Sequence, residues 1–126
     1  MSPAEEQMHA SPELRRTVLL VEDEVLLRMV LSDELRVRGF NVVEAASGDE
    51  ARKLVLAGIE FDLVLSDITM PGELDGADLA RWLCDNEVNA PVIFTSGLPT
   101  ALDRAREIYD HDDVLAQVET ALKSRE

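Results

Sequence analysis

Four short runs of apolar, β-favouring residues, separated by segments long enough to form a helix, constrain this fold more than any other feature. The first run, 17–21, is continuously apolar and stops at three acidic residues, which is typical of a strand buried on both faces of a parallel sheet. Parallel strands need crossover connections of a dozen or more residues, which the intervening segments supply. The segments predicted to be strands are 17–21, 41–45, 61–66 and 91–95.

Apolar residues at helical spacing fill the segments between these strands. The predicted helices cover 25–38, 47–57 and 77–86. Ser47 and Glu50 have the spacing of a capping box at the start of the second helix. Because crossovers between parallel strands are right-handed, the alternation predicts an α/β fold, a doubly wound parallel sheet with helices on both faces.

The two ends of the chain do not follow this alternation. Residues 1–14 hold two prolines, three glutamates and few large apolar residues, so we expect a flexible N-terminal leader. Residues 15–126 have a suitable length for a single domain. Its last part, about 99–126, contains no further β-rich run and is predicted to be an atypical helical segment.

Charge and composition exclude several classes of function. The chain has 26 acidic and 12 basic side chains and a net charge of −14, which opposes a nucleic-acid-binding surface. A single cysteine cannot form an internal disulfide and favours a reducing compartment. We see no signal peptide and no apolar run near the ~20 residues that cross a bilayer. We therefore expect a cytoplasmic protein that binds neither nucleic acid nor membrane.

Acidic residues follow the first and third predicted strands. Glu22 and Asp23 end the first strand, and Asp67 ends the third. If these strands are neighbours, three carboxylates converge in one crevice, where a cation would offset their repulsion. Oxygen ligands in a partly hydrated cleft suit Mg²⁺. The alternative is that Glu22, Asp23 and Glu24 only cap the following helix, whose N-terminal dipole favours acids.

Asp67 is also a candidate nucleophile. A carboxylate beside a divalent cation can attack a phosphoryl group in line and form an aspartyl phosphate. Ser96 follows the fourth predicted strand, where its hydroxyl could donate a hydrogen bond to a phosphoryl oxygen, and Gly97 leaves room for that group.

Four motifs in this order resemble the receiver domain of two-component response regulators. They cover 18–24, 63–72, 75–76 and 91–97, within a matching stretch of about 16–98, roughly two-thirds of the chain. The resemblance implies a flavodoxin-like sheet with strand order 2-1-3-4 and a fifth strand beyond it.

The resemblance also implies roles for the matched residues. Asp67 would be the phosphoacceptor, and Mg²⁺ would be held by Asp67, by Asp23 directly and by Glu22 through a water molecule. Thr69 would give a backbone carbonyl to the metal and line the site. Ser96 would hydrogen-bond to the phosphoryl group. The phosphoryl donor would be a histidine kinase or a histidine phosphotransfer protein.

The C-terminal part departs from the family pattern. Receivers carry a lysine at the end of a fifth strand, but Glu107 stands at the matching position here. Only 11 residues separate Ser96 from Glu107, too few for a helix of ~11 residues, a strand of ~5 and their loops. We therefore expect the fifth strand to be missing or swapped, and a homodimer to form through the C-terminal segment.

Two hypotheses follow for the function. The first is a stand-alone receiver domain that accepts a phosphoryl group on Asp67 and signals by protein–protein contact, without being an enzyme in its own right. The alternative is a pseudo-receiver, a dimerisation or interaction module that acts without phosphorylation. The acidic residues and Ser96 favour the first hypothesis, and Glu107 in place of lysine favours the second.

Overall fold

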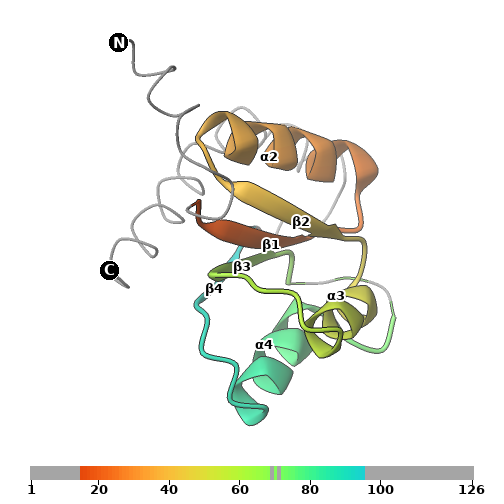
Figure 1. Cartoon of the computed structure of the whole chain (residues 1–126). Coiled ribbons are helices and arrows are strands. Elements are labelled where there is room, and N and C mark those ends of the chain that lie inside the picture. Colours follow the sequence, from red (N-terminus) through yellow and green to blue (C-terminus); the bar gives the residue numbers. More distant parts are fainter. Residues whose placement is uncertain (1–14, 69, 71, 96–126) are drawn as a thin grey trace.

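In the described part of the chain, four parallel strands form one sheet in the order β2-β1-β3-β4 (Figure 1). The computed structural model describes residues 15–68, 70 and 72–95. The strands are β1 (Thr17–Val21), β2 (Asn41–Ala45), β3 (Leu63–Ser66) and β4 (Val92–Phe94). The predicted strand order is confirmed. The leader, Thr69, Ser96 and the predicted loss or swap of a fifth strand lie outside the described residues.

The helices cover both faces of the sheet, as predicted. They are α2 (Val25–Val37), α3 (Gly48–Leu56) and α4 (Gly76–Asp85). In Figure 1, α2 lies on one side of the sheet, and α3 and α4 lie on the other. Among the described residues, no helix is both long and apolar enough to span a membrane.

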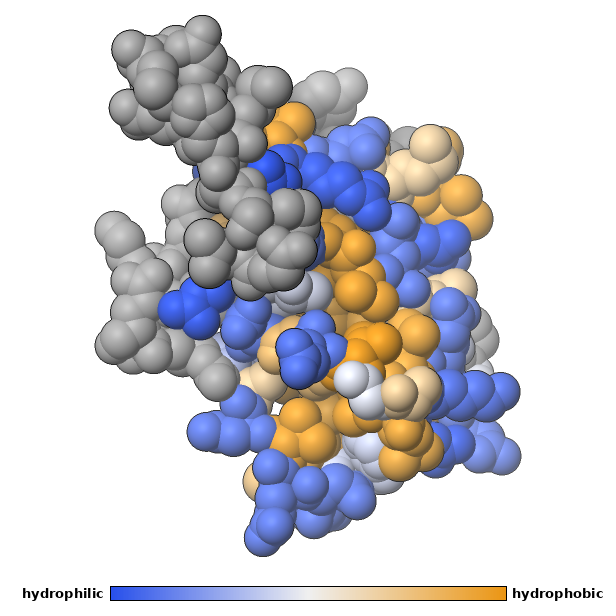
Figure 2. All heavy atoms as spheres, in the orientation of Figure 1, coloured by the Kyte–Doolittle hydropathy of each residue, from blue (hydrophilic) through white to orange (hydrophobic). Residues whose placement is uncertain are grey.

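The continuous apolar run of β1 arises because its residues serve two separate clusters of buried side chains. Val18 and Leu20 point to the α2 side, whereas Leu19 and Val21 point to the side of α3 and α4. The helices contribute Leu27, Leu31 and Leu35 to the first cluster and Ala51, Leu79 and Leu83 to the second. Figure 2 shows hydrophobic residues gathered along the layer of the sheet, between mostly hydrophilic outer helix surfaces.

Side-chain hydrogen bonds lie at two of the element boundaries that the sequence predicted. β3 begins two residues later than predicted, and there Asp62 accepts a hydrogen bond from the Thr17 amide through its carboxylate, at 2.7 Å. Ser47 caps α3 by accepting from the Glu50 amide, but the Glu50 carboxylate accepts from the Ala46 amide. The predicted capping box is therefore only half formed.

A full capping box that the sequence analysis missed begins α4. Asp75 accepts from the Asp78 amide at 2.9 Å, and the Asp78 carboxylate accepts from the Asp75 amide at 3.3 Å. The helix consequently starts at Gly76, one residue before the predicted start.

Two buried serines should respond in opposite directions to replacement by alanine. The Ser32 hydroxyl, inside α2, has no hydrogen-bond partner among the described residues, whereas the Ser66 hydroxyl donates to the Asp67 carbonyl at 2.8 Å. We expect Ser32→Ala to raise the free energy of unfolding by about 0.5–1 kcal/mol, since alanine is the better helix former. Ser66→Ala should lower it by about 0.5–1.5 kcal/mol. Urea unfolding of both variants checks this, and shifts of the same sign would contradict it.

Candidate functional site

Three carboxylates meet at the carboxyl end of the sheet. One oxygen from each of Glu22, Asp23 and Asp67 can be chosen so that all three lie within 4.8 Å of one another. The register of the strands produces this meeting, because Val21 pairs with Ser66 and the next residue of each strand follows at the same edge. The Asp67 amide donates to the Val21 carbonyl at 3.1 Å and extends that pairing.

Two of these carboxylates are almost completely removed from solvent. Glu22 is 0% exposed and Asp67 is 5% exposed, while Asp23 is half-buried. Like charges so close together, with little water around them, destabilise one another unless a cation or hydrogen bonds compensate them. The arrangement therefore favours binding of a hard divalent cation that prefers oxygen ligands.

The alternative role of these acids as helix caps is realised only in part. The Glu22 carboxylate accepts from the Glu24 amide at 2.9 Å, so it does satisfy one amide at the start of α2. Glu24 occupies the N-cap position, but its side chain makes no cap hydrogen bond. A carboxylate has a second oxygen, so capping by Glu22 leaves that residue able to face a cation as well.

Arg28 supports the turn that carries the acidic pair, and the sequence analysis did not identify it. Its guanidinium donates to the Glu22 carbonyl at 2.7 Å, and its Nε lies 3.7 Å from a carboxylate oxygen of Glu44 on β2. The signal in the sequence is a basic residue one helical turn after Val25, where a side chain can reach back to the preceding turn.

The backbone of Asp67 is held closely on both sides. The Ser66 hydroxyl donates to the Asp67 carbonyl, and the Gly76 amide donates to the Ile68 carbonyl at 2.7 Å. A Cβ atom added at Gly76 would collide with the Asp67 carbonyl oxygen. The glycine therefore allows the start of α4 to approach the backbone of the candidate nucleophile.

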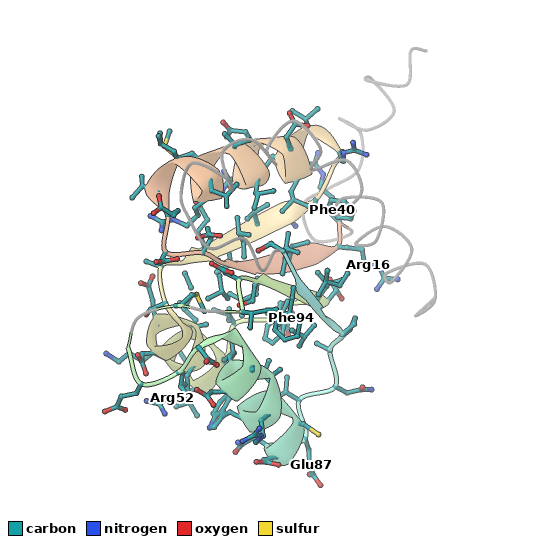
Figure 3. All side chains as sticks on the ribbon, turned by 180° about the vertical axis from the view of Figure 1, so that it is seen from behind. Arg16, Phe40, Arg52, Glu87 and Phe94 are labelled. Carbon is teal, nitrogen blue, oxygen red and sulfur yellow. The ribbon has the colours of Figure 1, made fainter. Side chains whose placement is uncertain are left out.

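Two of the predicted site residues, Thr69 and Ser96, lie outside the described residues. The residue before Ser96 is placed, and the Thr95 amide donates to the Ser66 carbonyl at 2.8 Å. The end of β4 therefore lies beside the end of β3 and next to Asp67. Arg16 marks the start of β1, at the opposite end of the sheet from the carboxylates (Figure 3).

Known proteins with similar sequences include a sensor kinase, a transcriptional regulatory protein and a response regulator protein. The family model described as the response regulator receiver domain matches residues 18–115. The sensor kinase CckA of Brucella abortus is 48% identical over 82 residues, which are 64% of this chain but only 9% of that protein. The chain thus spans a small part of this relative.

Two solved structures with the same fold align with this chain over nearly their whole length. A response regulator receiver protein of Sinorhizobium medicae is 27% identical in sequence and superposes with a TM-score of 0.76. The alignment covers 90% of this chain and 99% of the Sinorhizobium chain. The response regulator protein TrrA of Thermotoga maritima was determined in complex with Mg²⁺-BeF. It is 26% identical in sequence and superposes with a TM-score of 0.70, and the alignment covers 84% of this chain and 98% of the TrrA chain.

Removal of one charge from the acidic cluster should stabilise the metal-free protein. We expect Asp67→Asn to raise the free energy of unfolding by about 1–3 kcal/mol in the presence of a chelator, because its carboxylate lies within 4.8 Å of two others and charges this close repel by this order at an effective dielectric constant of about 20. Urea unfolding with chelator measures the change.

Asp33→Asn is the matched control, because Asp33 is exposed on α2 and lies outside the cluster. This variant should change the free energy of unfolding by less than about 0.5 kcal/mol. A destabilising effect of Asp67→Asn under these conditions would show that repulsion does not dominate the cluster.

Proposed function

Because the chain belongs to the response regulator receiver family, we propose that Asp67 accepts a phosphoryl group from a histidine kinase or a histidine phosphotransfer protein. The observation that carries this proposal is the meeting of Glu22, Asp23 and Asp67 at one end of the sheet. In the transfer, an Asp67 carboxylate oxygen attacks phosphorus and forms the new P–O bond. The P–N bond to the donor histidine breaks, and its electron pair stays on the imidazole ring.

We propose Mg²⁺ as the cation of this site. Glu22, Asp23 and Asp67 supply the hard oxygen ligands that Mg²⁺ prefers, and water molecules would complete its octahedral shell. Bound Mg²⁺ would neutralise charge on the transferring phosphoryl oxygens. The complex of TrrA with Mg²⁺-BeF supports the choice of metal, since that protein has the same fold.

The resemblance assigns two further roles to residues outside the described part of the chain. Thr69 would give its backbone carbonyl to the metal and line the site, and the Ser96 hydroxyl would donate to a phosphoryl oxygen. The position of Thr95 supports the second role, because its amide bonds to the residue before Asp67.

An apolar rim beside the acidic cluster supports a protein as the phosphoryl donor. The rim consists of Val25, Leu26, Met29 and Ile68, which are between 37% and 73% exposed. The three helical residues belong to the first turns of α2, directly after the acidic pair, and Ile68 directly follows Asp67. Exposed apolar side chains grouped at one place are typical of protein-binding surfaces.

The signal would leave this domain through protein–protein contact, and a homodimer through residues 99–126 stays a prediction. Within the described residues, β4 pairs with β3 alone. Sedimentation equilibrium of the full chain decides whether a dimer forms, and a monomer at all concentrations would remove this part of the proposal.

Phosphorylation can be tested with acetyl phosphate as a small-molecule donor. We expect the intact mass of the wild-type protein to increase by one phosphoryl group in the presence of Mg²⁺, because Asp67 belongs to the acidic cluster that we propose as the metal site. Asp67→Asn should show no increase, since the amide cannot form the acyl phosphate. A chelator should abolish the reaction in the wild type.

The same measurement separates the two hypotheses. No mass increase with either acetyl phosphate or a purified histidine phosphotransfer protein would overturn the proposed function and favour the pseudo-receiver. Glu107, which stands where the family has lysine, is the sequence feature that favours this second outcome. Asp62→Asn is the matched control, because it removes an aspartate at the other end of β3. This variant should be phosphorylated to the same extent as the wild type.

A further inference from the structure

The first turn of α3 holds the loop that leads from Asp67 to α4. The Glu73 amide donates to Asp49 Oδ2 at 3.1 Å across 24 residues of sequence. Gly72 has a φ of +109°, and a Cβ added to it would lie 2.5 Å from the same carboxylate oxygen. A Cβ at Gly48 would collide with the Leu74 carbonyl oxygen. Three consecutive loop residues therefore lie against the start of α3.

The carboxylate that makes this contact also pairs with a basic side chain of the same helix. Asp49 Oδ1 lies 3.7 Å from a guanidinium nitrogen of Arg52, one helical turn later, and the Asp49 side chain is 27% exposed. Its place in the first turn of α3 also suits the positive end of the helix dipole. Figure 3 shows Arg52 on α3, near the loop that leaves β3. Asp49 thus offers the loop a mostly buried acceptor in the first turn of α3.

The opposite end of the loop is joined to the candidate phosphoacceptor. The Gly76 amide donates to the Ile68 carbonyl, and Gly76 packs against the Asp67 carbonyl with no room for a side chain. Between these points, Met70 is buried in the apolar cluster under α3 and α4. Residues 72–74 thus lie between the contact with Asp49 on one side and the bond of Gly76 to Ile68, next to Asp67, on the other.

We propose that Asp49 is a positioning residue for the chemistry at Asp67, acting through the loop that it holds at Gly72 and Glu73. Asp49 is not one of the three clustered carboxylates of the described residues, and the inference rests on the proposed function of Asp67. Its consequence is that the affinity for Mg²⁺ and the rate of phosphorylation depend on a hydrogen bond between α3 and the loop.

Asp49→Ala tests this inference with Mg²⁺ affinity as the readout. We expect the affinity, measured by calorimetry, to fall about threefold to tenfold. Replacing a residue that hydrogen-bonds directly to a metal ligand typically costs about 10- to 100-fold, and Asp49 acts less directly. Asp49→Asn keeps an oxygen that can accept from the Glu73 amide but carries no charge. It should recover most of the wild-type affinity if the contact, and not the charge, is responsible.

Ser47→Ala is the matched control for damage to α3 itself. It removes the N-cap that accepts from the Glu50 amide, in the same turn of the helix, without touching the loop. We expect this variant to be less stable but to bind Mg²⁺ as the wild type does. Equal losses of affinity in Ser47→Ala and Asp49→Ala would overturn the inference, as would an unchanged affinity in Asp49→Ala or a failure of Asp49→Asn to recover it.

Gly72→Ala approaches the same contact from the loop side. The added Cβ would press on Asp49 Oδ2 at a positive φ, so we expect a loss of Mg²⁺ affinity similar to that of Asp49→Ala. The double variant should lose little more than either single variant, because both break one contact. Fully additive losses would contradict the inference.

Amide exchange separates failure of this inference from failure of the proposed function. Wild-type protein that binds no Mg²⁺ would overturn the proposed metal site. In that case NMR exchange of the Gly76 amide, which bonds to the Ile68 carbonyl, still decides the inference. We expect faster exchange in Asp49→Ala than in Ser47→Ala, and equal rates would overturn the positioning role.

Discussion

The parallel pairing of β1 with β3 is the constraint on which the site depends. Val21 and Ser66 are partners in register, so the residues that follow them are brought to one edge even though their negative charges repel one another. The apolar clusters on the two faces of the sheet fix this register, because a slip by one residue would exchange every side chain between the faces. Burial of β1 and β3 thus compensates for the repulsion among Glu22, Asp23 and Asp67.

Hydrogen bonds to the backbone then orient the carboxylates. Arg28 holds the Glu22 carbonyl, the Glu24 amide holds the Glu22 carboxylate, and the Ser66 hydroxyl holds the Asp67 carbonyl. None of these contacts consumes both oxygens of an acidic side chain. The supporting groups therefore hold the backbone of Glu22 and Asp67 and one oxygen of Glu22, and they leave one oxygen of each acidic residue within 4.8 Å of the others.

The strands and the acidic cluster were predictable from sequence because their signals are local. Continuous apolar runs mark strands buried on both faces, and the residue after each run marks the edge where ligands bind. The contact of Asp49 with Glu73 joins a helix to an irregular loop 24 positions further along the chain. No periodic pattern in the sequence indicates such a pair. The capping box of Asp75 was missed for a smaller reason, since two aspartates replace the usual hydroxyl and glutamate.

The close approach of Gly76 to the Asp67 carbonyl couples the position of α4 to the end of β3. The helix has 10 residues and is therefore about 15 Å long. Its near end is tied to the backbone beside Asp67, and its far end meets solvent at Asp85. A tilt of the helix by about 4°, taken up in the packing of Leu79 and Leu83 against the sheet, would move the far end by about 1 Å. A backbone shift near Asp67 that is too small to alter the fold would thus change the surface that α4 presents, at its far end, to a partner protein.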